Sequence, residues 1–156
     1  MSKMIVLFVC TGNTCRSSMA EALFRDMLKR EGMDGAVEVK SAGVLACEGQ
    51  GASPQAIEVM KKRGLDLSSH SASQIDLELI RQADLILTMT ERHKNMVKAM
   101  EPMAFDKTFT LKEYVGENPT DIMDPFGQSV DVYSRCAQEI EEALEKLINQ
   151  LKKRLA

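Results

Sequence analysis

The stretch that decides the fold is residues 4–21, MIVLFVCTGNTCRSSMAE. An apolar run of strand length ends at Cys10, a short polar loop containing Gly12 follows, and Arg16 begins a helical pattern. A glycine-bearing loop between a strand and a helix turns backbone N–H groups inward, where they suit an anion. The stretch therefore predicts an oxyanion site with a thiol at one end and a guanidinium at the other.

Cys10 and Arg16 are the candidate reactive pair. A free thiol is mostly protonated at neutral pH, but a helix N-terminus and a nearby cation both favour the thiolate. Arginine offers a planar fork of donors for two phosphate oxygens. The alternatives are an inert buried cysteine and an ordinary surface arginine. The position between a strand and a helix favours the reactive pair, and an oxyanion held over a thiolate is the starting geometry for phosphoryl transfer to sulfur.

Other residues of the loop shape it. Gly12 and Asn13 both tolerate the positive φ angles that a tight cradle needs. Ser17 can donate a hydrogen bond to the thiolate, or it can simply cap the helix, and the two roles are compatible.

A second candidate site is the stretch Asp121-Ile122-Met123-Asp124-Pro125-Phe126-Gly127. Asp-Pro followed by Gly is most often only a turn. Phosphatase chemistry at a thiolate, however, needs a carboxylic acid to protonate the leaving atom. Asp124 suits that role because Pro125 stiffens the backbone beside it, and Asp121 is the rival carboxylate.

Composition bounds the remaining possibilities. With 156 residues, the chain is expected to form one domain over residues 1–156. The net charge is -3 and the one basic block is Lys152-Lys153-Arg154, which argues against a nucleic-acid partner. Without a secretion signal or an apolar stretch of membrane-spanning length, we expect a cytoplasmic monomer with no membrane partner and with free thiols on its four cysteines.

Strand and helix patterns alternate along the chain, which predicts an α/β fold. We expect a four-stranded parallel sheet flanked by helices on both faces. The predicted strands are residues 4–9, 37–41, 84–89 and 108–111. The predicted helices begin at Arg16, Pro54, residue 76 and the residue after Thr90, and a long final helix begins near Val132. The segments 43–52 and 115–130 are expected to be irregular, and such loops commonly carry function.

The chain resembles a known family, the low-molecular-weight protein tyrosine phosphatases, over nearly its full length. The matching segments occur in the family's order and are residues 9–17, 19–21, 41–43, 70–72, 84–89 and 124–127. The resemblance implies that Cys10 attacks phosphorus, that Arg16 holds the phosphoryl oxygens, and that Asp124 acts first as general acid and then as base. One departure is Ser18, where the family usually has proline, and a helix start tolerates both.

The resemblance also assigns the surrounding residues. Asn13, Ser17, Ser41 and His70 correspond to the family's hydrogen-bond network behind the loop. The residues implied to bind the substrate are Thr11, Gly12, Asn13, Thr14, Cys15, Arg16, Ser17 and Phe126. Phosphorylated proteins are the implied substrates, inorganic phosphate or another oxyanion is an implied ligand of the loop, and no cofactor is implied. The chain has two histidines, His70 and His93, and neither has metal-ligand spacing to the cysteines, so no metal is expected.

Thr14 and the pair Phe126-Gly127 bear on the substrate. Tyrosine-specific members of the family usually carry an aliphatic residue at the position of Thr14 and two aromatic residues after Asp-Pro. In having threonine at position 14, the chain resembles the bacterial protein-arginine phosphatases. Two rings suit a phenyl group, while one ring, a carboxylate and a hydroxyl suit a guanidinium. We therefore expect phosphoarginine in proteins as the substrate. The alternative is a protein tyrosine phosphatase with the same mechanism, in which Thr14 is an ordinary packing residue.

The other cysteines separate further alternatives. In the family, a cysteine placed like Cys15 can form a reversible disulfide with the nucleophile, which would protect Cys10 from irreversible oxidation; otherwise Cys15 is a small buried residue. A thiol-linked arsenate reductase needs two more cysteines, and none lies between Cys47 and Cys136.

A further alternative is a phosphopeptide-binding module that has lost catalysis. The joint presence of Cys10, Arg16 and Asp124 argues against it. His93 is expected to be structural.

Overall fold

The computed structural model describes residues 3–156, and it has the predicted fold class. Four strands, all parallel, form one sheet in the order β2-β1-β3-β4. The strands are β1 (Met4–Cys10), β2 (Val37–Gly43), β3 (Leu85–Thr88) and β4 (Thr108–Thr110). The helices are α1 (Arg16–Arg30), α2 (Pro54–Lys62), α3 (Leu77–Gln82), α4 (Glu91–Met100), α5 (Leu111–Tyr114) and α6 (Val130–Leu155), with a 3-10 helix, η1, at Pro102–Lys107.

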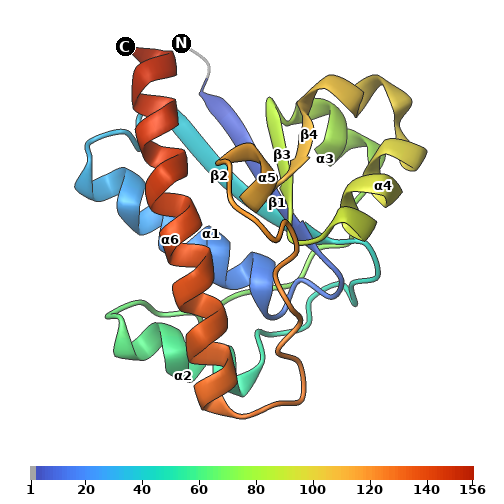
Figure 1. The fold of residues 1–156 in the computed structure, drawn as a ribbon. Coiled ribbons are helices and arrows are strands. Elements are labelled where there is room, and N and C mark those ends of the chain that lie inside the picture. The colour runs from blue at the N-terminus through green and yellow to red at the C-terminus, as the bar shows by residue number, and fades with distance from the viewer. Residues whose placement is uncertain (1–2) are drawn as a thin grey trace.

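The sheet is covered on both faces, as Figure 1 shows for α1 and α6 on one side and α3 and α4 on the other. Strand β1 supplies both cores because its side chains alternate. Phe8 packs into the core under α1, α2 and α6, whereas Leu7 and Val9 join Ile80 of α3 and Val97 of α4. A strand buried on both faces is expected to read as a continuous apolar run, which explains the sequence before Cys10.

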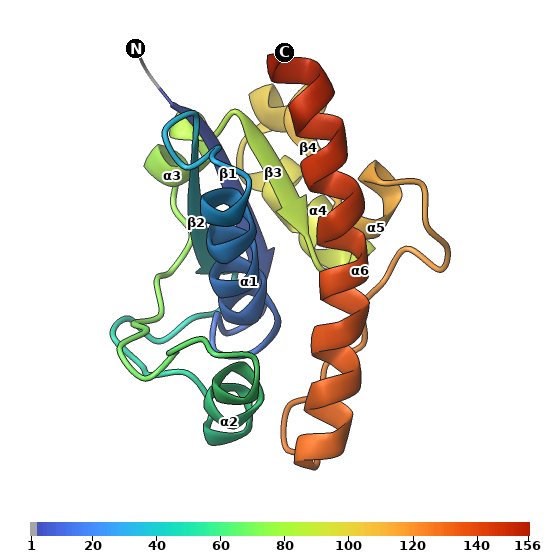
Figure 2. The same cartoon turned by 90° about the vertical axis from the view of Figure 1, so that its left-hand side faces the viewer.

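Helix α6 is the longest element and runs along one face of the molecule beside α1 and α2 (Figure 2). The Ser129 side chain caps it by accepting a hydrogen bond from the N–H of Val132. Its buried stripe is spaced by three or four residues and comprises Tyr133, Ala137, Ile140, Leu144, Leu147 and Leu151. Burying each of these leucine side chains stabilises the fold by about 1.5–3 kcal/mol. The stripe therefore fixes α6 and the loop that precedes it.

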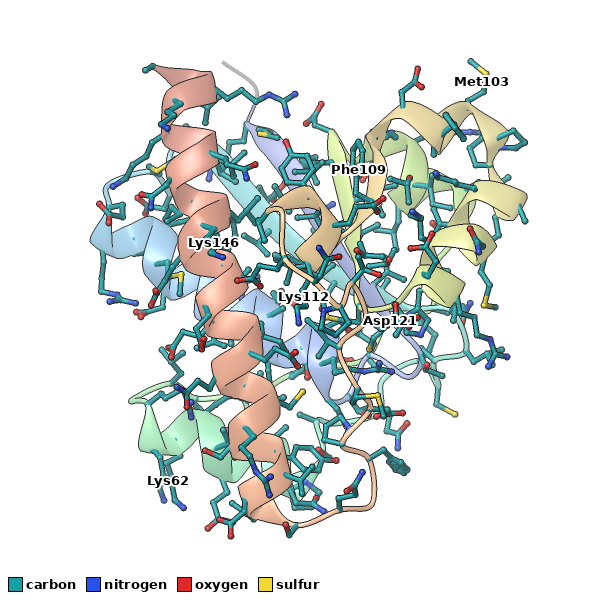
Figure 3. All side chains as sticks on the ribbon, in the orientation of Figure 1. Lys62, Met103, Phe109, Lys112, Asp121 and Lys146 are labelled. Carbon is teal, nitrogen blue, oxygen red and sulfur yellow. The ribbon has the colours of Figure 1, made fainter. Side chains whose placement is uncertain are left out.

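Boundaries differ from the predictions at several places. β2 extends to Gly43 and α6 begins at Val130, and the four-residue α5 and the 3-10 helix were not predicted. Both missed elements are too short to show a helical period. The two largest apolar side chains of the 3-10 helix, Met103 and Phe105, are 88% and 63% exposed, and Met103 points outward (Figure 3). They therefore form no buried apolar stripe like the ones that mark the longer helices.

The arrangement of the strands places the functional loops together. β1 lies between β2 and β3, so the chain leaves it toward one neighbour and later returns on the other side. Ligands of open α/β sheets bind at the carboxyl ends of the strands at such a switch point. The N–H of Ile122 donates to the carbonyl of Met89 at 2.8 Å, just beyond β3. The loop before α6 is thereby held beside the carboxyl end of β1.

Candidate active site

The loop from Cys10 to Arg16 forms a tight cradle at the carboxyl end of β1. Asn13 has a φ of 59°, the left-handed conformation that asparagine tolerates better than most residues. Its backbone N–H donates to the Cys10 Sγ at 3.3 Å. The neighbouring strand presses against the loop, because a Cβ built on Gly43 would lie 2.4 Å from the Thr11 carbonyl oxygen. The loop therefore has little freedom to open.

The Cys10 thiol is 2% exposed and lies 2.9 Å from the hydroxyl oxygen of Ser17 in the first turn of α1. The Asn13 side-chain amide donates to that same Ser17 oxygen at 2.8 Å. Since the amide N–H occupies an acceptor position of Ser17, the hydroxyl proton of Ser17 is free to be donated to sulfur. Two donors thus converge on Cys10, which is the arrangement that a thiolate requires.

The predicted network behind the loop is present. The Asn13 amide also donates to Ser41 Oγ at 2.9 Å, and His70 Nε2 lies 2.6 Å from the Asn13 carbonyl oxygen. Sequence reasoning missed two partners. Ser73 donates its backbone N–H to Asn13 Oδ1 at 2.9 Å, and the Ser41 hydroxyl donates to the Glu21 carboxylate. Every side-chain polar group of Asn13 is therefore occupied, which holds the strained backbone of the loop in place.

Arg16 is 4% exposed, yet its guanidinium is only partly satisfied. One terminal nitrogen donates to the Ile122 carbonyl at 2.8 Å, and the other lies 3.6 Å from Asp124 Oδ2. Among residues 3–156, Arg16 Nε is the only fully buried side-chain nitrogen or oxygen without a hydrogen-bond partner. A buried unpaired donor is costly, and beside a thiol and a helix N-terminus it suits an oxyanion.

The two rival carboxylates have different surroundings. Asp121 Oδ1 accepts the backbone N–H of Glu91 at 2.8 Å, so Asp121 fastens its loop to the first turn of α4 (Figure 3). Asp124 is half exposed, faces Arg16, and accepts the N–H of Phe126 at 3.1 Å. Only Asp124 lines the pocket above Cys10. The structure therefore favours Asp124 over Asp121 as the group that meets a substrate.

The pocket above the loop has a volume of about 440 Å³. Its walls include Thr11, Gly12, Thr14, Cys15, Arg16, Asp124, Phe126 and Tyr133. Phe126 is 66% exposed and Thr14 is partly buried, so one aromatic ring and one hydroxyl border the space. Asn13 and Ser17, which were also predicted to bind the substrate, do not line this pocket, and neither do Ser41 and His70.

Cys15 Sγ lies 3.2 Å from the Tyr133 hydroxyl and 3.5 Å from Ser53 Oγ. Tyr133 was not predicted to belong to the site, because on α6 it looks like any stripe residue. Burial, together with the hydrogen bond to Cys15, raises the pKa of Tyr133 to about 12, so its hydroxyl stays protonated. The redox role of Cys15 stays a prediction.

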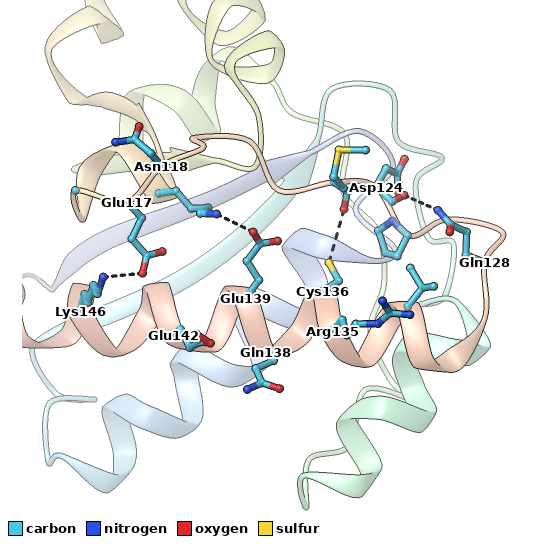
Figure 4. A pocket seen from close by; sticks show the side chains of 15 residues that line it. Glu117, Asn118, Asp124, Gln128, Arg135, Cys136, Gln138, Glu139, Glu142 and Lys146 are labelled. Atoms are coloured by element: carbon cyan, nitrogen blue, oxygen red, sulfur yellow. Dashed lines mark hydrogen bonds and ion pairs between the residues drawn. The ribbon is translucent and has the colours of Figure 1, made fainter.

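A second and larger depression adjoins the pocket on the other side of Asp124. This groove of about 860 Å³ lies between α6 and residues 112–128 (Figure 4). Its charges pair across it, Lys112 with Glu139 at 2.7 Å and Lys146 with Glu117 at 2.7 Å. Cys136 lies on its floor, where burial raises the pKa of the thiol to about 12 and keeps it unreactive.

The described residues hold neither a metal cluster nor a membrane-spanning helix. Within residues 3–156, no group of three or more His, Cys, Asp or Glu side chains is arranged to hold a metal ion. Over the same residues, no helix combines the length and the apolar character needed to cross a membrane.

Comparison with known proteins places this site in a family. The family described as low molecular weight phosphotyrosine protein phosphatase matches residues 5–156. The protein-arginine-phosphatase of Bacillus subtilis is 47% identical over 150 residues, which cover 96% of this chain and 98% of that protein. A solved structure of YwlE arginine phosphatase, a mutant with a phosphorylated active-site serine, has a TM-score of 0.91 at 46% identity and covers 96% of this chain and 97% of its own.

A further solved structure, a low molecular weight protein tyrosine phosphatase from T. tengcongensis, has a TM-score of 0.90 at 46% identity and covers 95% of this chain and 99% of its own. The similar proteins therefore carry two different substrate names on one fold. With a family match that spans nearly the whole chain, this chain belongs to the low molecular weight phosphotyrosine protein phosphatase family.

Proposed function

We propose that the chain is a cysteine-dependent protein phosphatase that hydrolyses phosphoarginine in proteins through a phosphocysteine intermediate. The observation that carries the phosphatase chemistry is the unpartnered Arg16 Nε buried beside Cys10 and faced by Asp124. The names of the similar proteins support the choice of reaction, and the B. subtilis relative is itself named a protein-arginine-phosphatase.

In the first step, the Cys10 thiolate attacks phosphorus, the sulfur–phosphorus bond forms, and the phosphorus–nitrogen bond breaks. Asp124, as the carboxylic acid, gives its proton to the departing guanidine nitrogen. The N-terminus of α1, the Arg16 guanidinium and the donors on sulfur stabilise the charge on the three phosphoryl oxygens and on the thiolate.

In the second step, Asp124 as carboxylate removes a proton from water, which attacks phosphorus. The sulfur–phosphorus bond breaks, Cys10 returns as the thiolate, and inorganic phosphate leaves the loop. All groups that these steps require come from the chain itself, so the proposed reaction involves no cofactor.

Thr14, Phe126 and Gly127 support phosphoarginine over phosphotyrosine. A second aromatic ring would complete a sandwich around a phenyl group, but the chain has glycine there. The Thr14 hydroxyl and the half-exposed Asp124 carboxyl offer polar partners to a guanidinium. The competing candidate is a tyrosine phosphatase, which the T. tengcongensis neighbour favours.

Matched peptides that differ only in phosphoarginine or phosphotyrosine decide between these candidates. We expect kcat/KM to favour phosphoarginine by at least about tenfold, the range that one polar contact provides. A preference for phosphotyrosine would establish the alternative and leave the roles of Cys10, Arg16 and Asp124 intact. The predicted monomer is tested by gel filtration of the same preparation, and a cytoplasmic location remains a prediction.

A further inference from the structure

A chain of hydrogen bonds connects helix α4 to the residue that follows the nucleophile. Thr11 Oγ1 lies 2.9 Å from His93 Nε2, and His93 Nδ1 lies 3.0 Å from Thr90 Oγ1. The backbone N–H of His93 also donates to Thr90 Oγ1 at 3.2 Å, the N-terminal cap of α4. His93 is 3% exposed, so its ring has few other partners available. The imidazole thus bridges a helix cap and the phosphate-binding loop.

The direction of these bonds follows from the hydrogens available. Thr90 Oγ1 already accepts from a backbone N–H, and within residues 3–156 its hydroxyl proton has one nearby acceptor, His93 Nδ1. If Nδ1 accepts, the single proton of a neutral imidazole is on Nε2 and is donated to Thr11 Oγ1. The opposite tautomer would accept the Thr11 proton at Nε2 and would leave the Thr90 proton without an acceptor among residues 3–156. With an oxyanion in the pocket to accept the Thr11 proton, the first arrangement satisfies both hydroxyl groups.

The surroundings of His93 keep the ring neutral. Burial, followed by the positive charges of Arg16 and Arg92, lowers the pKa of His93 to about 4. At neutral pH the ring therefore has one N–H and one acceptor nitrogen, as the bond directions require.

The consequence falls on the Thr11 hydroxyl. Thr11 borders the catalytic pocket, and within the described residues His93 is the side-chain partner of its oxygen. Once that oxygen accepts from His93, the Thr11 hydroxyl proton has no acceptor among residues 3–156 and can be donated to a ligand in the pocket. His93 was predicted to be structural, because nothing in the sequence shows that residues 11 and 93 meet.

We propose that His93 is a positioning residue for phosphate binding: it holds Thr11 so that the Thr11 hydroxyl donates a hydrogen bond to an oxygen of the bound phosphoryl group. The proposal rests on the proposed phosphatase site, but it does not depend on whether the leaving group is arginine or tyrosine. Thr11 touches the ligand, and His93 acts through Thr11.

Two substitutions at His93 separate this role from simple packing. His93→Gln keeps an N–H donor at the place of Nε2, whereas His93→Asn is too short to reach Thr11 but can still meet Thr90. Thr11→Val removes the hydroxyl at nearly constant volume. The readout is inhibition by inorganic phosphate during hydrolysis of a simple aryl phosphate, with the melting temperature recorded for each variant.

We expect His93→Asn and Thr11→Val each to weaken phosphate inhibition by roughly tenfold, the usual scale of one hydrogen bond to a charged group. His93→Gln should stay within about threefold of the wild type, and the double variant Thr11→Val/His93→Asn should lose no more than the worse single variant. Asn95→Ala, at an exposed position of α4, is the control and should change nothing.

Unchanged phosphate inhibition in Thr11→Val overturns the proposal outright. A loss in His93→Asn that adds in full to that of Thr11→Val, or that His93→Gln shares equally, shows a packing role and also overturns it. An enzyme that hydrolyses the aryl phosphate but not phosphoarginine peptides would contradict only the proposed substrate. An enzyme without turnover of either would contradict the proposed function itself.

Discussion

The phosphate-binding loop and the loop that carries Asp124 form opposite walls of one pocket, yet they are built differently. Asn13 and Ser17 are completely buried, and each polar group of the Asn13 side chain has a protein partner. In the other loop, Met123 is 80% exposed, Phe126 is 66% exposed and Asp124 is half exposed. We propose that the nucleophile and the phosphoryl cradle lie on the enclosed wall, whereas the open wall carries the general acid Asp124 and, at Phe126 and Gly127, most of the contacts that distinguish substrates.

The largest effect is expected from the enclosed wall at the nucleophile. Cys10→Ser should abolish turnover but retain phosphate binding, because backbone N–H groups and Arg16 form most of the cradle. Phosphate titration by calorimetry, together with a turnover assay, measures both properties. Substantial residual hydrolysis would show that Cys10 is not the nucleophile.

The open wall should supply the next effect through its carboxyl group. Asp124→Asn should lower kcat by about 10²–10⁴, the usual contribution of a general acid and base. Asp121→Asn, in the same loop, is the matched control, and it should do far less because Asp121 fastens the loop to α4. Steady-state kinetics at one pH compare the two, and a reversed order would move the general acid to Asp121.

A third effect concerns the free energy of unfolding of the protein and comes from His93, which contacts Thr11 on the enclosed wall. Unfolded His93 takes up a proton near its ordinary pKa of 6.5, whereas the folded protein resists protonation until about pH 4. The unfolded state therefore binds more protons between these values, and the free energy of unfolding falls as the pH is lowered. This difference should destabilise the protein by about 2 kcal/mol between pH 7 and pH 5.

Urea unfolding at the two pH values, compared between the wild type and His93→Gln, isolates this contribution. The variant has no titrating ring at this position, so its loss of stability over the same interval should be smaller by about 2 kcal/mol. An equal loss in both proteins would mean that His93 is not held neutral.

The smallest effect should come from Thr14, the one residue of the enclosed loop to which we assign a part in substrate choice. Thr14→Ile removes a hydroxyl and adds apolar surface, so the ratio of kcat/KM values should move toward phosphotyrosine by at least about tenfold. The matched peptides described above measure the ratio. A ratio that does not move would contradict the proposed preference for phosphoarginine, while the phosphatase assignment, which rests on Cys10, Arg16 and Asp124, would stand.

The same contrast explains what the sequence could predict. The strand, loop and helix around Cys10 are contiguous in the sequence, so the types and order of their residues were enough to predict the phosphate-binding loop. Phe8 and Val9 likewise show a strand buried on both faces.

Contacts between distant segments could not be predicted in this way. The partners Ser73, Tyr133 and His93 lie far from Cys10 in the sequence, and each looks ordinary in its own helix or loop. Glu21 lies nearby in α1, but nothing in the sequence pairs it with Ser41. Their roles depend on which helix face meets the loop, and apolar periodicity does not specify polar partners. The sequence also could not show that Asp121 accepts the backbone N–H of Glu91, which is the structural reason for preferring Asp124 as the general acid.

Gly43 has a consequence for engineering this enzyme. Replacing one of its hydrogens by a methyl group would place carbon 2.4 Å from the Thr11 carbonyl oxygen and 2.9 Å from the Asn13 nitrogen. Relief requires the backbone beside the nucleophile to move, although Gly43 meets no substrate. A library that aims to change selectivity should hold this position constant and diversify Thr14 and Phe126, which border the pocket. Gly127 should also stay, because its φ of 77° would strain any side chain.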